Sequence, residues 1–326
     1  MSISRRGFLG STAVAGLASA QVPKQTLPRR TLGNTKAQVS ILAFGGGSRF
    51  LMYKEEDKAI EAVNRALDLG ITYLDTAFAY GNGLSESRMG KVMATRRKEV
   101  FLATKMQERD GEKVQRIIEG SLKRLQTDQL DLIHIHELKT EEDLAQIETK
   151  GNILDVLHKL RDQKVTRFIG VTCHNDPSVL KTALERHDFD CVQMALNAAL
   201  VGMKSGSGKM IPAPEVKTSF ETLALPVAVR KKMGIIAMKT QAADALAGQA
   251  SVEKLLYYAL SLPVATASVG MPTLEYIAQN TALARAFRPL PADEMKELSE
   301  ALSSKNKMAL DHYFQHHKDE FGSMLA

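Results

Sequence analysis

ITYLDTAFAYG, residues 71–81, is the stretch around which this chain is organised. Its first half, Ile71 to Asp75, is typical of a buried strand, and its second half, Thr76 to Gly81, is typical of a loop that carries Tyr80. A buried carboxylate is costly unless a cation or hydrogen-bond donor compensates it. The sequence therefore predicts that another polar side chain pairs with Asp75 where this strand ends.

Three further apolar runs end in polar side chains. VFLATK ends in Lys105, DLIHIH ends in His136, and CVQMALN ends in Asn197. Parallel strands of an α/β barrel point their carboxyl ends at one face, and active sites lie at that face. We therefore expect these side chains to converge with Asp75 and Tyr80 on a single site.

Helix-period and strand-like segments alternate along the chain, which predicts an α/β fold. A hairpin, Thr31–Gln38 followed by Val39–Phe44, leads into the first barrel strand, and the later strands are expected at Ile71–Asp75, Val100–Lys105, Leu130–His136, Arg167–Cys173, Cys191–Asn197, Gly234–Lys239 and Val264–Val269. The helices between them are expected at Glu55–Leu69, Ser85–Ala94 with Ser85 as N-cap, Asp110–Leu125, Ile153–Gln163, Pro177–His187, Glu221–Lys232, Ser251–Ser261 and Thr273–Ala286. This order predicts one closed (β/α)8 TIM barrel with an N-terminal β-hairpin. An extra C-terminal helix at Asp293–Ser303 could cover an end of the barrel.

Three segments lack a clear period and are interpreted as surface or loop. Residues 139–151 are charged, and Arg49–Tyr53 and 201–220 show no diagnostic pattern. A loop as long as 201–220 usually has a role, such as that of a lid, or is disordered.

The first twenty residues have the features of a leader. Ser4-Arg5-Arg6-Gly7-Phe8-Leu9 resembles the twin-arginine export signal, and Ala18-Ser19-Ala20 resembles a cleavage site; a basic, disordered tail is the alternative. We therefore expect a twin-arginine signal peptide at 1–20, a linker at 21–30 and a single barrel domain at 31–326. The chain would be exported already folded by the twin-arginine machinery to the periplasm or another extracytoplasmic space.

Composition narrows the possible partners. Apolar residues make up 44% of the chain and charged residues 25%, which are globular values. Loss of the leader lowers the net charge from +6 to +4, and the remaining charge is spread along the chain, so no nucleic acid is expected. The leader run is too short and weakly apolar for stable membrane insertion. Cys173 and Cys191 would lie at opposite ends of the barrel and are not expected to pair.

Asp75, Tyr80, Lys105 and His136 together suggest proton transfer to a carbonyl. A phenol has an ordinary pKa near 10, which an adjacent ammonium such as Lys105 lowers. Asp75 would hold Lys105, and His136 would orient a substrate oxygen. Protein side chains cannot supply a hydride, whereas a nicotinamide can. The alternative is a structural Asp–Lys pair beside an incidental Tyr and His.

The chain resembles the aldo-keto reductases over nearly all of 29–290. The matching pieces are RRTLGNTKAQVSILAFGGG, LDTAFAYGNGLSESRMGKVM, VFLATK, DLIHIH, IGVTCHND, VQMALN and SVGMPTLEYIAQN. Asp75, Tyr80, Lys105 and His136 fall on the family's catalytic pattern. The resemblance implies an NAD(P)-dependent oxidoreductase acting on a small carbonyl or alcohol, with Tyr80 as general acid or base and 201–220 near the cofactor.

The resemblance also implies cofactor contacts. The run Gly45-Gly46-Gly47 ends the first barrel strand with bare backbone that a ligand could approach closely; a plain flexible turn is the alternative. The nicotinamide carboxamide would be held by Gln193 and by Thr172 with Cys173, where Cys173 replaces the usual Asn. Met238 stands where an aromatic ring commonly stacks on the nicotinamide, and Lys239 follows it.

The adenosine end matches the family less well. Gly270, Met271 and Tyr276 stand where the family usually places a Lys, a Ser and an Arg around the 2′-phosphate of NADP. Thr273, Gln279 and Asn280 remain suitable for the adenosine. The cofactor is thus expected to be NADP or NAD, with a preference for NADP that the two missing cations weaken.

Other functions remain open at this point. Gly270, Met271 and Cys173 would also suit a nucleotide-binding barrel that acts as a sensor or partner subunit with little turnover. Glu137 and Glu86 could pair as the carboxylates of a hydrolase. His134, one layer below His136, is expected to be a core histidine with a satisfied hydrogen bond. Joined by His136 and His174, it could bind a metal, but no further ligand pattern supports this and no metal site is expected.

Overall fold

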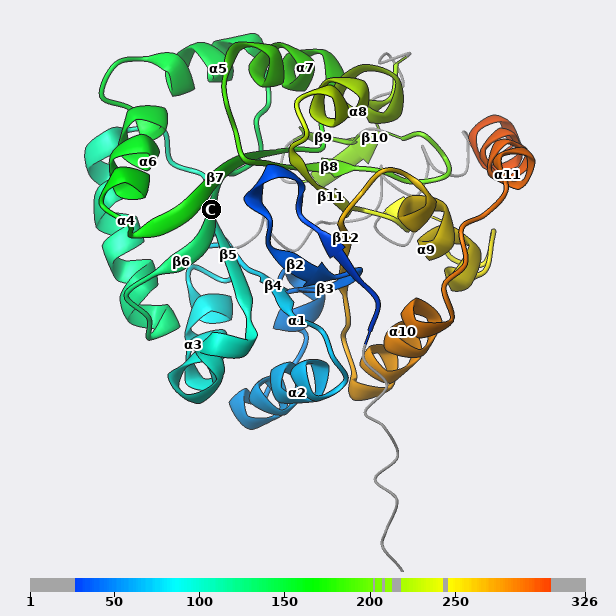
Figure 1. Cartoon of the computed structure of the whole chain (residues 1–326), viewed down its shortest axis with the longest axis horizontal. Helices are drawn as coiled ribbons and strands as arrows, with labels where there is room; N and C mark the ends of the chain where they lie inside the picture. Colours follow the sequence, from blue (N-terminus) through cyan, green and yellow to red (C-terminus); the bar gives the residue numbers. More distant parts are fainter. Residues whose placement is uncertain (1–26, 202, 207–208, 213–217, 243–245, 306–326) are drawn as a thin grey trace, which may run out of the picture.

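Eight parallel strands close a barrel in this computed structural model, which describes residues 27–305 except 202, 207–208, 213–217 and 243–245 (Figure 1). Their order around the barrel is β3, β4, β5, β6, β7, β8, β11 and β12. Their bounds are Leu42–Gly45, Tyr73–Asp75, Phe101–Met106, Leu130–Ile135, Thr166–Cys173, Cys191–Ala195, Gly234–Met238 and Thr266–Gly270. The predicted (β/α)8 barrel is confirmed.

Amphipathic helices surround the strands. The helices α2, α3, α4, α6, α7, α8, α9 and α10 span Glu56–Asp68, Leu84–Arg96, Gly111–Leu125, Ile153–Asp162, Pro177–Arg186, Phe220–Arg230, Val252–Ser261 and Leu274–Ala286. The α4 helix shows the local logic: Asp110 accepts a hydrogen bond from the Lys113 N–H as N-cap, and Val114, Ile118 and Leu125 bury one face against the barrel.

The predicted N-terminal hairpin closes the amino end of the barrel. Its strands β1 (Arg29–Thr31) and β2 (Gln38–Ser40) pair antiparallel around a short 3-10 turn. Leu32 is fully buried with the inward-facing residues of the barrel. Gly33 has φ +52°, and a Cβ there would collide with the backbone of Met233 and Gly234, so the turn needs glycine.

The start of the domain differs from the prediction in two ways. β1 begins at Arg29, inside the stretch 21–30 assigned to a linker. The single strand predicted at Val39–Phe44 is two strands, because the chain breaks at Ile41 to pass from the hairpin into the barrel. The Ser40 hydroxyl stabilises this bend by donating to the Leu42 carbonyl oxygen.

Two short helices occupy segments expected to lack regular structure. The α1 helix (Ser48–Leu51) lies within the supposed loop Arg49–Tyr53, and α5 (Glu141–Glu148) lies within the charged segment 139–151. The sequence did not reveal α5 as a helix, because most of its residues are polar or charged and only Leu144 and Ile147 are buried along its length.

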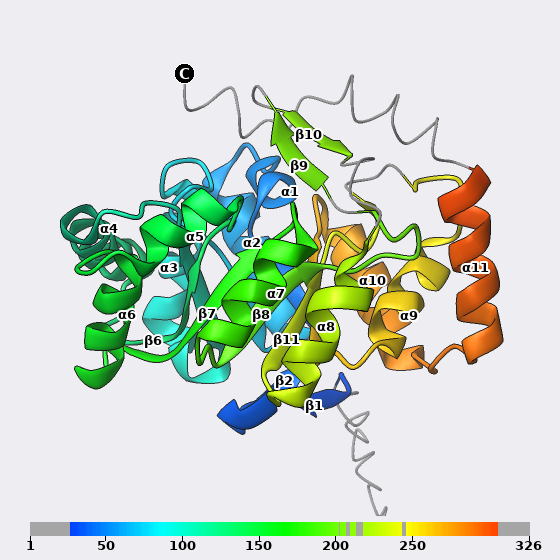
Figure 2. The same ribbon diagram turned by 90° about the horizontal axis from the view of Figure 1, so that it is seen from above.

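The segment 201–220 is not simply a loop. It contains the antiparallel strands β9 (Met203–Gly206) and β10 (Lys209–Pro212). Strands of four residues are too short to show a reliable period in the sequence. Figure 2 shows β9, β10 and α1 at one end of the barrel and β1 and β2 at the other.

Two further expectations about helices are corrected. The N-cap position of α3 is Gly83, whereas Ser85 lies in the first turn, where its hydroxyl donates to the Gly46 carbonyl oxygen. The extra C-terminal helix is present as α11 (Ala292–Lys305), but it lies at the side of the barrel near α9 (Figures 1 and 2). There Leu302 packs with Leu255 and Tyr258.

Both cysteines are free. Cys173 ends β7 and Cys191 begins β8, as expected. Among the described residues, no helix combines the length and the apolarity that a membrane crossing needs. The proposed leader lies outside the described residues.

Candidate active site

Asp75, Tyr80, Lys105 and His136 all come from the carboxyl ends of three adjacent strands. Asp75 ends β4, Lys105 lies near the end of β5, and His136 directly follows β6. Tyr80 lies on the loop after β4. Because side chains alternate along a strand, Lys105 faces the barrel interior with Ala103, and the chain thus delivers its polar side chains to the mouth.

The Lys105 ammonium contacts Asp75 at the end of β4 and both Thr76 and Tyr80 on the loop that follows. Its Nζ lies 2.7 Å from Asp75 Oδ1, donates to the Thr76 carbonyl oxygen at 3.0 Å and donates to the Tyr80 phenol oxygen at 3.2 Å. The side chain of Lys105 is 1% exposed. The buried ammonium is therefore compensated by one carboxylate and by two hydrogen bonds.

Asp75 is held on its other side as well. Its Oδ2 accepts from Gln193 Nε2 and from the Ser268 hydroxyl, each at 3.1 Å. Ser268, on β12, was not anticipated from the sequence. Its place two residues before Gly270, in a strand that ends at the same face, is the signal that could have identified it.

Tyr80 and His136 face each other across the mouth. Their ring centroids are 5.6 Å apart and the rings meet edge to face at 81°. His136 is 8% exposed, and its Nδ1 has no hydrogen-bond partner among the described residues. The phenol and the imidazole therefore flank one position at which a carbonyl oxygen could sit.

Charge and burial set the protonation states. Burial raises the pKa of the Tyr80 phenol above its ordinary value, and Lys105 offsets only part of that rise; the expected net lowering is wrong. Burial alone would lower the pKa of Lys105, but Asp75 and Tyr80 raise it overall. Burial, together with Lys105, holds the pKa of His136 well below its ordinary value. The site at neutral pH thus contains a neutral phenol, an ammonium and a neutral imidazole.

The three residues assigned to the nicotinamide carboxamide do not all point the same way. Gln193 lies inside the barrel with Nε2 on Asp75, and its Oε1 has no hydrogen-bond partner among the described residues. Thr172 Oγ1 accepts from the Glu137 N–H at 2.8 Å, which leaves its proton available. Cys173 packs in the outer apolar layer and donates to the Leu138 carbonyl oxygen, so the structure does not bring its thiol to the mouth.

The glycine run is packed rather than bare. A Cβ at Gly46 would lie 2.6 Å from Met89 Cε and 2.8 Å from both the Asp75 carbonyl oxygen and Ser85 Oγ. Gly46 therefore brings β3 close to β4 and α3, and its lack of a side chain does not by itself open the site. Gly47 is the N-cap of α1, and Met238 and Lys239 are half-buried where β11 ends.

The residues assigned to the adenosine end lie around β12 and α10. Gly270 ends β12, Met271 is fully buried, and Thr273 is the N-cap of α10. Asn280 is buried, whereas Gln279 and Tyr276 are exposed. A Cβ at Gly270 would lie 2.7 Å from both Cβ and Cγ of Arg49, so the stem of Arg49 occupies the space over this strand end.

Asn197 does not join the site as predicted, and His134 lacks the hydrogen bond that was predicted for a core histidine. The Asn197 amide hydrogen-bonds the backbone of Val201 in both directions. Neither ring nitrogen of His134 has a hydrogen-bond partner among the described residues, so the expected satisfied hydrogen bond is absent. Across the part of the chain that the structure describes, no group of three or more His, Cys, Asp or Glu could hold a metal ion.

The two glutamates considered for a hydrolase are engaged elsewhere. Glu86 is fully buried outside the barrel wall, where it accepts from Thr104 Oγ1 and pairs with Arg124 at 2.8 Å. Glu137 accepts from Gln107 Nε2 at 2.6 Å. Thr104 directly precedes the inward-facing Lys105, so its side chain points out of the barrel. Glu86, which contacts Thr104 there, cannot reach the mouth. The hydrolase hypothesis is therefore wrong.

Comparison with known proteins agrees with this fold. The sequence pattern of the aldo/keto reductase family matches residues 42–248, and the chain belongs to this family. It is 37% identical over 155 residues to the L-galactose dehydrogenase of Arabidopsis thaliana, a match covering 44% of this chain and 47% of that protein. It is 37% identical over 130 residues to the aldo-keto reductase YhdN of Bacillus subtilis, covering 36% and 38%. The chain thus matches about half the length, or less, of these relatives.

Solved structures share the fold. The holo form of aldo-keto reductase AKR11C1 from Bacillus halodurans has a TM-score of 0.67 and 23% identity, covering 84% of this chain and 96% of that one. An aldo-keto reductase from Klebsiella pneumoniae in complex with NADPH has a TM-score of 0.66 and 21% identity, covering 87% and 99%.

Proposed function

We propose that this protein is an NAD(P)-dependent oxidoreductase that interconverts a small carbonyl and the corresponding alcohol. The observation that carries the proposal is the contact of 3.2 Å between Lys105 Nζ and the Tyr80 phenol oxygen, with Asp75 at 2.7 Å behind the ammonium. Family membership and the dehydrogenases and reductases among the relatives support it. The intact tetrad favours catalysis over the sensor hypothesis.

The site residues fit the proposed chemistry. A nicotinamide supplies the hydride when it is bound. In reduction Tyr80 donates its proton to the carbonyl oxygen, and the neutral His136 imidazole orients that oxygen. Lys105 stabilises the phenolate that remains. Asp75 holds the ammonium of Lys105 in place, with Oδ1 2.7 Å from Nζ. In alcohol oxidation the same groups act in reverse.

The polar groups of the barrel interior fit a nicotinamide amide. Gln193 has an acceptor oxygen without a partner among the described residues, and Thr172 retains a donor. We therefore assign these two residues to the carboxamide, and we keep Gly47, Met238 and Lys239 as further proposed cofactor contacts. Thr273, Gln279 and Asn280 are assigned to the adenosine.

NADP is the proposed cofactor, with NAD as the alternative. The similar Klebsiella structure contains NADPH. Gly270 lacks the family's cation, but Arg49 lies directly over it and could supply the charge that a phosphate needs. Arg49→Met keeps the stem and removes the charge. Equal loss of affinity for NADPH and NADH in this variant would argue against a contact with the 2′-phosphate.

Nucleotide binding and turnover test the proposed function together. Purified protein is titrated with NADPH and with NADH by fluorescence, denatured protein is assayed for released nucleotide, and small aldehydes, ketones and sugar lactols are then supplied. We expect binding of at least one nucleotide and its oxidation by a carbonyl. If neither nucleotide binds and none is released, the proposal is wrong.

We also propose that the protein acts outside the cytoplasm. The motive is the leader at 1–20, with Arg5 and Arg6 before an apolar run and Ala18-Ser19-Ala20 as cleavage site. Twin-arginine export carries folded proteins, so a tightly held nucleotide could travel with the barrel and be recycled by paired oxidation and reduction. The proposed mature protein begins after residue 20 and carries the single barrel domain, whose first strand β1 begins at Arg29.

Fractionation of cells that make the full chain tests this location. Wild-type protein should be found shortened in the extracytoplasmic fraction, whereas a variant with Arg5→Lys and Arg6→Lys should stay in the cytoplasm with its leader attached. Cytoplasmic retention of both proteins would contradict the proposal.

A further inference from the structure

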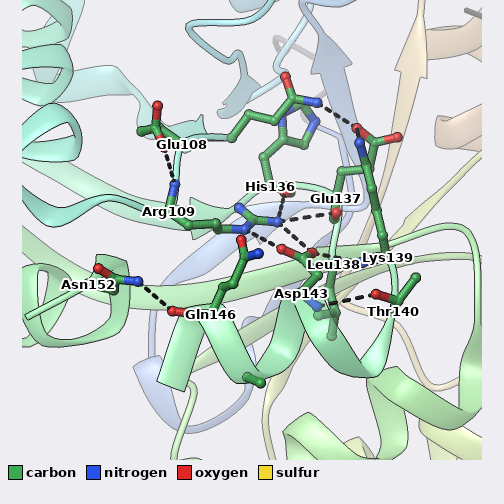
Figure 3. Close-up of polar contacts among 12 residues, drawn as sticks. Glu108, Arg109, His136, Glu137, Leu138, Lys139, Thr140, Asp143, Gln146 and Asn152 are labelled. Atoms are coloured by element: carbon green, nitrogen blue, oxygen red, sulfur yellow. Dashed lines mark hydrogen bonds and ion pairs between the residues drawn. The ribbon is translucent and has the colours of Figure 1, made fainter. Parts of the chain in front are cut away.

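Arg109, at the end of the segment that follows β5, is almost fully buried beside the active site. The guanidinium forms a two-pronged ion pair with Asp143 on α5, with Nε 2.8 Å from Oδ1 and Nη2 2.9 Å from Oδ2 (Figure 3). Arg109 is 8% exposed. A planar guanidinium is suited to this fork geometry, which a lysine cannot reproduce.

The same guanidinium binds the backbone at His136. Arg109 Nη2 donates to the carbonyl oxygen of His136 at 2.9 Å and to that of Glu137 at 3.3 Å (Figure 3). Its Nη1 donates to the carbonyl oxygen of Met106 at 3.4 Å. The carbonyls of His136 and Glu137 lie just beyond the last pair of the β5–β6 ladder, Met106 with Ile135, and the Met106 carbonyl oxygen also accepts from the His136 N–H at 2.8 Å. Arg109 therefore replaces sheet hydrogen bonds at the point where the imidazole leaves the barrel wall.

The chain turns sharply immediately after His136. Glu137 has φ +58°, in the left-handed region that costs a non-glycine residue free energy unless its surroundings hold it. Its N–H donates to Thr172 Oγ1 at 2.8 Å, and its carboxylate accepts from Gln107. Thr172 on β7 and Arg109 thus hold opposite edges of the peptide that follows the catalytic histidine.

We propose that Arg109, anchored by Asp143, is a positioning residue that sets where the His136 imidazole lies at the mouth of the barrel. The inference rests on the proposed function only for the role of His136. It adds a residue that touches neither Tyr80 nor the substrate position but acts through the backbone of its neighbour. Through Asp143 it also connects α5, a helix outside the barrel, to the reacting groups.

A double-mutant cycle with His136 tests this inference. The variants are Arg109→Ala, His136→Ala and both together, with turnover and nucleotide affinity measured for each. We expect Arg109→Ala to lower kcat about 10- to 100-fold, because a displacement near 1 Å can cost that much, without changing nucleotide affinity. In the His136→Ala background, Arg109→Ala should cost nothing further, and Arg109→Lys should restore only part of the loss.

Arg97 provides a matched control at the other end of the same strands. It pairs with Asp131 at 2.9 Å and donates to the carbonyl oxygens of Val100 and Gln129. Arg97→Ala therefore removes a similar ion pair and similar carbonyl contacts far from His136. It should leave kcat unchanged even if it lowers stability.

A spectroscopic readout makes the test independent of turnover. The His136 Cε1–H signal, identified by its loss in His136→Ala among the eight histidines, should shift in Arg109→Ala and not in Arg97→Ala. If Arg109→Ala does not fold, Asp143→Asn is examined in the same way and should give a smaller change of the same kind. Multiplicative losses in the cycle, or an unmoved His136 signal, would overturn the inference. Absence of wild-type turnover with either nucleotide would instead defeat the proposed function, and the signal would still decide the role of Arg109.

Discussion

At the scale of single residues, Tyr80 shows how burial and charge compete. The sequence places a lysine beside a phenol and so suggests a lowered pKa, but burial raises the pKa of Tyr80 more than Lys105 lowers it. The consequence is favourable for reduction, because an acid must hold its proton until the substrate oxygen takes it. Lys105 then acts mainly on the phenolate that forms.

The buried histidines predict how stability depends on pH. Burial, with Lys105, holds the pKa of His134 well below the ordinary 6.5. Below pH 6.5, His134 therefore binds a proton in the unfolded chain but stays neutral in the folded chain. The free energy of unfolding consequently falls as the pH falls. One such histidine contributes about 1.4 kcal/mol per pH unit.

His134→Phe isolates this effect from other titrating groups. Burial raises the pKa of Glu221 to about 7, which acts in the opposite direction in wild type and variant alike. In urea unfolding from pH 7.5 to pH 5.5, about the range in which a histidine ionises, wild type should lose more stability than His134→Phe. Parallel pH dependence of the two proteins would contradict the assignment.

At the scale of elements, α3, β5 and α4 are joined by one buried carboxylate. Glu86 on α3 accepts from Thr104 on β5 and pairs with Arg124 on α4 at 2.8 Å. Glu86→Gln should lower the free energy of unfolding by about 3 kcal/mol, near the lower limit for breaking a buried pair, because the Arg124 side chain is 26% exposed. Denaturant titration measures it.

The exposed pair between Glu61 and Lys58 is the control for this prediction. Its atoms lie 3.0 Å apart on the solvent side of α2, and Glu61→Gln should have little measurable effect. Equal stability loss in the two variants would show that the burial of Glu86 does not matter. Unchanged nucleotide binding in Glu86→Gln is also expected, since this carboxylate lies outside the barrel wall.

The elements also show what a sequence can reveal. The barrel strands were predictable because they are apolar runs of strand length, and some of these runs end in polar residues at one face, as with Asp75 and Lys105. The strands β9 and β10 and the helix α5 have too few buried positions to leave a period. Contacts such as that of Arg109 with Asp143 join residues far apart in the chain. A local sequence pattern cannot predict such contacts.

At the scale of the whole molecule, the amino end of the barrel is closed by the hairpin. Leu32 is fully buried among inward-facing residues, and Arg30 donates to the carbonyl oxygens of Leu260 and Val264 at 2.9 and 2.7 Å. Leu32→Ala should lower the free energy of unfolding by about 2–5 kcal/mol through the cavity it leaves. Leu84→Ala, at a residue that is 42% exposed, is the control and should cost much less.

The hairpin prediction separates stability from function. The tetrad lies at the carboxyl ends of the strands, opposite the hairpin, so nucleotide affinity should be the same in Leu32→Ala and wild type below the melting temperature. A loss of affinity without unfolding would show that the two ends of the barrel are coupled.

The central claim is that the Tyr80 phenol, held by Lys105, donates the proton in carbonyl reduction. Tyr73 offers a matched control, because it is a fully buried phenol that stacks on Phe101 and whose hydroxyl has no hydrogen-bond partner among the described residues. The most direct measurement is the single-turnover oxidation of bound reduced nicotinamide by a carbonyl in wild type, Tyr80→Phe and Tyr73→Phe. We predict that Tyr80→Phe binds the nucleotide normally but reacts about 10²- to 10⁴-fold more slowly, while Tyr73→Phe reacts at the wild-type rate. Equal rates in wild type and Tyr80→Phe would contradict the account.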